Sequence, residues 1–432
     1  MAPLTPLDTT WVLICGFLVM LMQAGFCLFE AGLVRTKNSI NVAFKNLSDF
    51  TITAIVYWAF GFGVMYGESV SGLFGFSDFA IAPAGDLGSW FLFQMMYCGA
   101  AVTIVGGALA ERTSYSAYLV LSILIGTLLY PVPGHWIWAG EGDGWLAQLG
   151  FIDFAGGTVV HVLGGTLALA AVLIVGPRIG RFPDPESDEK PPPINASSYP
   201  MATVGVMLLW FGWFGFNAGS LVGYKENLAL VAVNTGLSAA AGGATMIFWC
   251  LYRTGKPDVG SVLNGTLAGL VGVTAGANIF SVPDAVLAGI SGSVFMRCAV
   301  VVLDRLKIDD VVGAFPVHAA AGVSGTLLVA LLGDPAVFPN GHSVLQQFYI
   351  QFAGVATVTA WSMVVGFGMF HLINKFQPMR VSETEELQGL NYSEHGASTE
   401  VHDLLGNMIN QGRSGNISRC MYWKCSNHIV YF

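Results

Sequence analysis

The chain has 432 residues, of which 54% are hydrophobic and only 10% are charged. An average soluble domain carries roughly 25% charged residues, so this composition excludes an ordinary soluble protein. The 18 basic residues are dispersed under a net charge of −9, which argues against a nucleic-acid-binding surface.

Long apolar segments dominate the chain and predict an all-α integral membrane protein. About 20 apolar residues let one helix cross a bilayer, and segments of this kind recur along the whole chain. The first one follows an N-terminus without the basic region of a signal peptide, so we expect it to be retained. The eleven predicted transmembrane helices span residues 11–34, 48–67, 90–110, 115–134, 153–176, 199–220, 227–251, 259–280, 283–303, 313–333 and 345–374.

Basic residues predict how these helices are oriented. With eleven spans, 17 of the 18 lysines and arginines fall on one face of the membrane, and only Lys225 falls on the other. Because cytoplasmic loops carry the excess of basic residues, we expect the N-terminus outside and the C-terminus in the cytoplasm.

A long polar connection, residues 177–198, divides the chain into two halves of five predicted helices and one extra helix. An odd number of helices per half forces the second half to enter the membrane inverted relative to the first. We expect residues 399–432, a cytoplasmic tail extension, to be disordered or the stub of a linker. The predicted units are a membrane domain at 1–398, containing a first repeat at 11–176, a second repeat at 199–333 and a final helix at 345–374, and a tail extension at 399–432.

Two histidines lie inside the apolar segments, His161 in the fifth predicted helix and His318 in the tenth. An ionisable side chain is costly in hydrocarbon and usually faces a bundle interior or a pathway. One interpretation of each ring is a core histidine that bonds a neighbouring helix. Their equivalent places in the two repeats favour a pathway, with the two rings meeting near the bilayer centre.

Asp153 shares one helix face with Gly157 and His161, because the three residues recur at four-residue spacing. Its carboxylate is either an N-cap of the fifth helix or a buried charge that shapes a cation site, and the two roles are compatible. No cluster of cysteine or carboxylate ligands accompanies either histidine. We therefore predict no metal site, and we expect neither a cofactor nor an enzymatic function.

Aromatic side chains gather toward the predicted outer face. An interfacial aromatic belt is the common explanation of such a pattern. The alternative is a vestibule whose ring faces attract a small cation, at about 0.5–2 kcal/mol per contact. The residues concerned are Tyr97 in the third helix, Trp138 before the fifth helix, and Trp213 and Phe216 in the sixth, near Ser220.

Seven segments of the chain carry a more specific signal. They are MQAGFCLFEAGLVRTKN (22–38), GALAER (107–112), DFAGGTVVH (153–161), WFGFNAGS (213–220), GLVGVTAG (269–276), VHAAAG (317–322) and RVSETEELQGLNYSEHG (380–396). Together they resemble the ammonium transporter (Amt/Rh) family, in the family's order and over nearly all of the chain. This resemblance implies eleven helices in two inverted repeats and a homotrimer in the plasma membrane, with a pore through each subunit. It also implies ammonium or ammonia as substrate, and a PII-type regulatory protein as a candidate partner at the cytoplasmic face.

The resemblance also implies a role for the polar residues singled out above. His161 and His318 match the family's twin pore histidines. Trp138 and Ser220 match an outer recruitment site for ammonium, and Asp153 matches the acidic residue that supports it.

The aromatic residues match a gate, with one departure. Phe216 matches one of two stacked gate residues, and Trp213 supports the vestibule. The other gate position falls on Tyr97, where the family usually has phenylalanine. A phenol still stacks, but its hydroxyl offers a ligand for water or ammonium and changes how tightly the gate closes.

We predict a transporter or channel that recruits ammonium at an aromatic vestibule, deprotonates it and passes ammonia through an apolar pore lined by the twin histidines. A narrow apolar lumen imposes a large desolvation cost on any ion, and ammonium, unlike potassium, can shed a proton. Imidazoles both donate and accept, so they can share or relay that proton. The alternative is an ammonium sensor on the same scaffold with little or no flux, which Tyr97 and the tail favour. A metal or proton channel is a third class.

Overall fold

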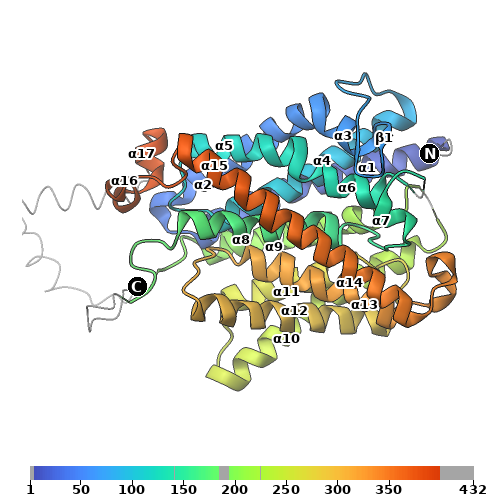
Figure 1. Ribbon diagram of the computed structural model, residues 1–432. Helices are drawn as coiled ribbons and strands as arrows, with labels where there is room; N and C mark the ends of the chain where they lie inside the picture. Colours follow the sequence, from blue (N-terminus) through green and yellow to red (C-terminus); the bar gives the residue numbers. More distant parts are fainter. Residues whose placement is uncertain (1–3, 141, 184–193, 224, 399–432) are drawn as a thin grey trace, which may run out of the picture.

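The computed structural model describes residues 4–140, 142–183, 194–223 and 225–398. Over these residues the chain is almost entirely helical, and its long helices form one bundle (Figure 1). The predicted tail extension at 399–432 lies outside the described residues.

The first half of the chain supplies five long helical segments, three of which contain a π-helical turn. A short antiparallel hairpin lies in the connection after the second segment. The elements are α1 (Pro6–Leu33), α2 (Thr36–Val56), η1 (Tyr57–Gly61), α3 (Phe62–Tyr66), β1 (Ser69–Val70), β2 (Phe74–Gly75), α4 (Gly85–Ala108), α5 (Tyr115–Leu124), η2 (Ile125–Leu129), α6 (Pro131–Trp138), α7 (Trp145–Gln148), η3 (Gly157–Val162) and α8 (Leu163–Val175).

The second half repeats this plan and adds a last long helix and two short ones. Its elements are α9 (Tyr199–Gly219), α10 (Leu228–Thr254), α11 (Val259–Thr274), α12 (Val282–Arg305), η4 (Phe315–Ala320), α13 (Ala321–Leu332), η5 (Pro335–Val337), η6 (Pro339–Gly341), α14 (Val344–Trp361), η7 (Ser362–Gly366), α15 (Phe367–Phe376), α16 (Glu383–Gln388) and α17 (Leu390–His395). The continuous helix α14–η7–α15 crosses the bundle obliquely, against α13 of the second half and α5 and α8 of the first (Figure 1).

The predicted membrane class is confirmed. Ten helical segments of the described residues are long and apolar enough to cross a membrane. The eighth predicted position is occupied by α11, which has 16 residues and is shorter than the about 20 that a full span needs. The count of eleven spans and the orientation of the termini therefore stay predictions. In Figure 1 the N-terminus and the helices α16 and α17 lie at opposite ends of the bundle.

The second helix, predicted at residues 48–67, starts earlier than predicted, because α2 begins at Thr36. Polar residues in its first turns predict a loop, yet Asn38 and Asn46 are buried among other helices. Asn38 Nδ2 donates to the Glu111 carboxylate over 2.8 Å, so the polar face of α2 has partners inside the protein. A buried polar group with a partner is compatible with a helix interior, and hydropathy alone misses it.

The two halves meet where α1 crosses α9, the first helix of each half. The backbones touch at this crossing. A Cβ built on Gly205 would lie 2.4 Å from the Phe29 backbone nitrogen and 2.7 Å from the Gly25 carbonyl oxygen. Any side chain larger than hydrogen would push the two helices apart, so this crossing requires glycine.

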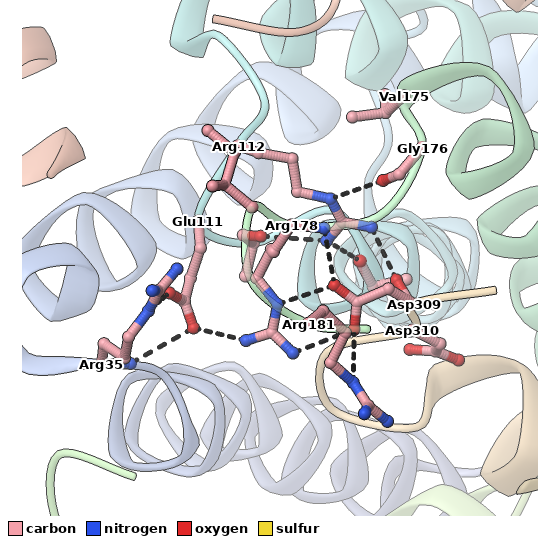
Figure 2. A network of polar contacts seen from close by, with 12 residues as sticks. Arg35, Glu111, Arg112, Val175, Gly176, Arg178, Arg181, Asp309 and Asp310 are labelled. Atoms are coloured by element: carbon pink, nitrogen blue, oxygen red, sulfur yellow. Dashed lines mark hydrogen bonds and ion pairs between the residues drawn. The ribbon is translucent and has the colours of Figure 1, made fainter. Parts of the chain in front are cut away.

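A cluster of charged residues joins the two halves at the end of the bundle where Ile179 contacts Glu386 of α16. Figure 2 shows this cluster from close by. Arg178 follows α8 and donates to Glu111 over 2.6 Å and to both carboxylate oxygens of Asp309 over 2.8 and 2.9 Å. Arg35 binds the other oxygen of Glu111. We call this cluster the Arg178 network, and it comprises Arg35, Glu111, Arg112, Arg178, Arg181 and Asp309.

The Arg178 network keeps its carboxylates charged. Burial alone would raise the pKa of Asp309, but hydrogen bonds and charge attraction from Arg178 outweigh it and lower that pKa from 3.8 to about 2. Burial would likewise raise the pKa of Glu111, and the charges of Arg178 and Arg35 lower it instead. Both groups are therefore carboxylates at neutral pH.

We expect acid to weaken the fold through Asp309. A carboxyl whose pKa is lower in the folded protein stabilises the fold above its unfolded pKa, and this contribution is lost as pH falls through the folded value. The midpoint of thermal unfolding in detergent should therefore fall as pH drops from about 4 towards 2. Asp309→Asn should flatten this part of the profile, and an unchanged slope in that variant would contradict the assignment.

The segment 380–396 docks on the same end of the bundle as α16 and α17. Glu386 on α16 accepts a hydrogen bond from the Ile179 backbone nitrogen over 2.7 Å and pairs with Arg380 over 2.7 Å. Lys37 Nζ, from the start of α2, donates to the Glu386 carbonyl over 2.7 Å. The docked segment therefore contacts α2 and the residues that follow α8.

Candidate functional site

His161 and His318 meet in the interior of the bundle. Their Nδ1 atoms are 3.1 Å apart, and the rings are nearly parallel, with centroids 5.2 Å apart and an interplanar angle of 16°. One Nδ1 donates and the other accepts, because a neutral imidazole carries one hydrogen on its two nitrogens. The pair then has one Nε2 with a hydrogen and one without. The His161 Nε2 is buried and has no hydrogen-bond partner among the described residues.

Each histidine lies in a π-helical turn. The turn η3 carries His161 and η4 carries His318. A π turn holds more residues than an α turn, so it displaces its side chains from regular helical positions, and such turns occur often at functional sites. A hydrophobic pattern cannot distinguish a π turn from an α turn, so neither π turn is predictable from the sequence.

Asp153 binds the beginning of the helix that carries His161. Its carboxylate accepts hydrogen bonds from the backbone nitrogens of Gly156 (3.1 Å), Thr158 (2.9 Å) and Val159 (2.8 Å). The Asp153 carbonyl accepts a further bond from Trp138 Nε1 over 2.8 Å. The residue therefore joins the histidine helix to the predicted recruitment tryptophan. It also leaves a negative charge at the positive end of the helix.

Asp310 repeats this arrangement at the start of η4. Its carboxylate accepts from the backbone nitrogens of Gly313 (3.0 Å), Ala314 (3.0 Å) and Phe315 (2.8 Å). A glycine with positive φ stands three residues after the aspartate in both places, +83° at Gly313 and +98° at Gly156. Glycine adopts this conformation without strain, which lets the chain turn back so that the nitrogens face the carboxylate.

Tyr97 and Phe216 form a tight stack beside His161. Their ring centroids are 3.9 Å apart with an interplanar angle of 9°, and both side chains are buried. The Phe216 ring is 5.6 Å from the His161 ring. The Tyr97 hydroxyl donates to the Phe216 carbonyl and lies 2.9 Å from Ser220 Oγ. The structure thus brings the two predicted gate residues and one predicted recruitment residue into a single cluster.

Trp213 lies deeper in the bundle than the vestibule predicted for it. Its indole is fully buried and stacks on the His161 ring, with centroids 5.0 Å apart and an angle of 15°. Its Nε1 donates to Thr274 Oγ1 over 3.0 Å, which fixes the plane of the ring. Trp213 therefore forms a wall behind the histidine pair.

Two adjoining cavities lie on the side of the stack away from the histidines. The smaller has a volume of about 200 Å³, and its walls include Tyr97, Trp138 and Ser220. The larger, about 660 Å³, shares Trp138 with it and has the carboxylates Asp78 and Asp143 in its wall. Trp138 and Ser220, two of the residues predicted for recruitment, therefore line the smaller cavity, whereas Asp153 lies in the wall of neither cavity.

Two residues near the histidines were not predicted from sequence. The Phe26 ring lies 6.2 Å from the His318 ring, and no spacing distinguishes it from the many other phenylalanines. For Asp310 a signal does exist. DFAGGTVVH and DVVGAFPVH share an aspartate, a glycine three residues later and a histidine eight residues later.

Comparison with known proteins places this arrangement in a family. The model of the Ammonium Transporter Family matches residues 10–400. A putative ammonium transporter of Synechocystis sp. is 40% identical, and the match covers 96% of this chain and 78% of that protein. Ammonium transporter Amt2 of Archaeoglobus fulgidus is 39% identical, with 91% and 88% covered.

Solved structures agree with the sequence matches. A protein described as a sensor Amt protein superposes with a TM-score of 0.86 at 38% identity, covering 90% of this chain and 98% of that one. The crystal structure of Candida albicans Mep2 superposes with a TM-score of 0.79 at 28% identity, covering 88% of each chain. The chain therefore belongs to the ammonium transporter family and is a multi-pass membrane protein.

Proposed function

We propose that the protein takes up ammonium at the outer cavities, removes a proton and passes ammonia along His161 and His318. The observation that carries this proposal is the histidine pair, hydrogen-bonded through Nδ1 and separated from the cavities by the closed stack of Tyr97 and Phe216. The Nε2 ends of such a pair offer one donor and one acceptor. Ammonia, which has N–H groups and one lone pair, complements both.

Charge and aromatic faces support recruitment of a cation at the cavities. The Asp78 and Asp143 carboxylates raise the local concentration of cations, because a concave acidic surface focuses the field. The ring of Trp138 supplies a cation–π contact, and the Ser220 hydroxyl supplies an oxygen. The buried carboxylate of Asp153 adds a fixed negative charge below them.

Deprotonation explains how ammonium would be separated from potassium. An ion in the dry space around the histidines would lose its hydration without full replacement, whereas neutral ammonia loses far less. In the proposed step an N–H bond of ammonium breaks and a new N–H bond forms at the free Nε2 of the histidine pair. The Nδ1 hydrogen of that ring passes to Nδ1 of its partner, and the hydrogen on the partner's Nε2 leaves on the opposite side, so that both rings are neutral again. Potassium has no proton to give and stays outside.

We expect His161→Ala and His318→Ala to disrupt ammonium handling. In liposomes with an inward ammonium gradient, each variant should either show an ammonium flux at least about tenfold below that of the wild type or admit potassium. The reason is that the path for hydrogen bonds and protons is broken. Current and internal pH report the two outcomes. His371→Ala, which removes an exposed histidine of α15, serves as the control and should behave like the wild type. Full ammonium flux with potassium still excluded in both pore variants would refute the mechanism.

One observation favours an ammonium sensor as a second candidate function. The similarity to the sensor Amt protein extends over 98% of that chain. A sensor would bind ammonium at the same cavities and report it to the cytoplasm with little flux. Binding of ammonium without ammonium flux in the same liposomes would favour the sensor over the transporter.

We also propose, from the family resemblance, a homotrimer in the plasma membrane with a PII-type protein as cytoplasmic partner. Large apolar side chains are exposed on α10 and α12, including Phe248 (70%), Tyr252 (85%) and Phe295 (46%). These surfaces suit contact with lipid or with another subunit. Mass measurement of the protein in detergent tests the trimer, and a purely monomeric species would contradict it.

A further inference from the structure

Glu30 is a buried carboxyl group near the end of α1. It is 2% exposed, and among the described residues it forms no ion pair. Within that part of the chain, its side chain has one hydrogen bond, from Asn46 Nδ2 to Oε2 over 2.8 Å. Lys45, the neighbour of Asn46, donates from Nζ to the Thr113 carbonyl over 2.5 Å instead. An ionisable group inside a membrane helix usually serves a pathway.

Glu30 is packed beside the start of the helix that carries His318. One turn before it on α1, the Phe26 ring lies 6.2 Å from the His318 ring, and residues four apart share a helix face. A Cβ built on Gly107 would lie 2.6 Å from both Glu30 Oε1 and Val312 Cγ2. Val312 leads into η4, the turn that contains His318. The absence of a side chain at Gly107 therefore leaves room for the carboxyl group.

The Glu30 carboxyl differs from those of the Arg178 network in its freedom to change charge. It lies deeper in the bundle, because Gly107 precedes Glu111 by four residues and Val312 follows Asp309 by three. Glu111 and Asp309 have guanidinium partners that keep them charged. Glu30 has a single neutral donor, and a buried charge without a counter-charge is costly. It can therefore take up a proton and release it again.

The histidine pair requires a proton acceptor on this side. His161 adjoins the aromatic stack, with its ring 5.6 Å from that of Phe216, whereas His318 adjoins Phe26. The hydrogen that leaves the pair in the proposed step is therefore the one on His318 Nε2. His318 keeps an exposure of 5%, whereas His161 keeps none, so there is accessible space beside His318.

We infer that Glu30 accepts the proton that leaves His318 and returns it to ammonia beyond the histidine pair. The inference rests on the proposed function and adds to it the residue that receives the proton. The His318 Nε2–H bond breaks, its electron pair stays on the nitrogen, and an O–H bond forms at the Glu30 carboxylate, directly or through one water. That O–H bond then breaks, and the lone pair of ammonia takes the proton. Glu30 is a carboxylate again, and one positive charge has crossed with each ammonia.

Glu30→Gln tests this role, because an amide keeps the shape of the side chain and cannot take up the proton. Liposomes with an inward gradient of isotopically labelled ammonium report current, uptake of label and internal pH together. The current per molecule taken up should fall at least about tenfold, since the histidine pair must return its proton to the outer side. The internal pH should rise, because ammonia that enters without its proton binds one inside.

Two further variants separate proton transfer from a structural role. Glu383→Gln removes an exposed carboxyl at the start of α16 and is the matched control, with an unchanged ratio of current to uptake. Glu30→Asp keeps a carboxyl group that is one methylene shorter, so it should restore part of the current that Glu30→Gln loses. A purely structural side chain would instead lower current and uptake in equal proportion in both variants, and this result would overturn the inference.

The outcomes distinguish this inference from the proposed function. An unchanged ratio of current to uptake in Glu30→Gln would overturn the inference alone. Uptake without any current in the wild type would also overturn it and leave passage of ammonia intact. Absence of both uptake and current in the wild type would overturn the proposed function and the inference together.

Discussion

Arg178→Ala is expected to lower the free energy of unfolding by about 3–5 kcal/mol. The Arg178 guanidinium is buried and binds two carboxylates that are also buried, Glu111 and Asp309. Its removal leaves both negative charges inside the protein with fewer partners. An uncompensated buried charge is far more costly than a lost surface pair. Because the two carboxylates come from different halves of the chain, their repulsion would act across the junction between the halves.

Thermal and denaturant unfolding in detergent measure this effect. Arg178→Lys should fall between the wild type and the alanine variant, because an ammonium group cannot form the two-pronged bond that Arg178 makes with Asp309. Arg253→Ala, at the exposed end of α10, is the control and should change stability by less than about 0.5 kcal/mol. Equal effects of the two alanine variants would show that the Arg178 network contributes nothing to stability.

Asp153→Ala is expected to abolish ammonium transport in liposomes. The substitution removes the acceptor of three backbone nitrogens at the start of the helix that carries His161. Each buried nitrogen left without a partner costs about 1–3 kcal/mol, so the first turn should rearrange and displace the histidine. It also removes the negative charge proposed to attract the cation. Both effects act in the same direction.

Two further variants separate these effects. Asp153→Asn keeps an acceptor oxygen without the charge. This variant should therefore retain the fold, and its ammonium flux should fall about tenfold or more. Asp258→Ala removes another aspartate at a helix start, the N-cap of α11, where its side chain binds the Ser261 nitrogen. It should cost about 1 kcal/mol of stability and leave transport intact. Wild-type flux in Asp153→Ala would contradict a role for this carboxylate.

The positions of the membrane helices are predictable because hydrocarbon leaves the backbone few alternatives to a helix. The same rule fails at the start of α2, where Asn38 and Asn46 are polar and yet buried. Their partners lie on other helices, and hydropathy carries no information about them. The length of α11 is a similar case. Its sequence is apolar, but the helix ends at Thr274, within the predicted span 259–280.

The candidate site is predictable in its residues more than in its contacts. The histidines stand out because ionisable groups are rare in apolar segments, and a family resemblance supplies the aromatic residues. The π turns, the place of Trp213 behind His161 and the bond from Tyr97 to the Phe216 carbonyl depend on how separate helices pack. The Arg178 network likewise joins residues far apart in the chain, so no local pattern reveals it.

A series of contacts joins the docked segment 380–396 to η4, the turn that carries His318. Glu386 on α16 binds the backbone of Ile179, the neighbour of Arg178, and Arg178 binds Asp309, the neighbour of the Asp310 that caps η4. Wherever two binding events share such a series of contacts, the coupling free energy between them is reciprocal. If a partner stabilises the docked segment 380–396, it changes the free energy of ammonium binding in the pore by a certain amount. Ammonium binding in the pore then changes the free energy of docking by the same amount. Docking of the segment and occupancy of the pore would then be linked through one coupling free energy.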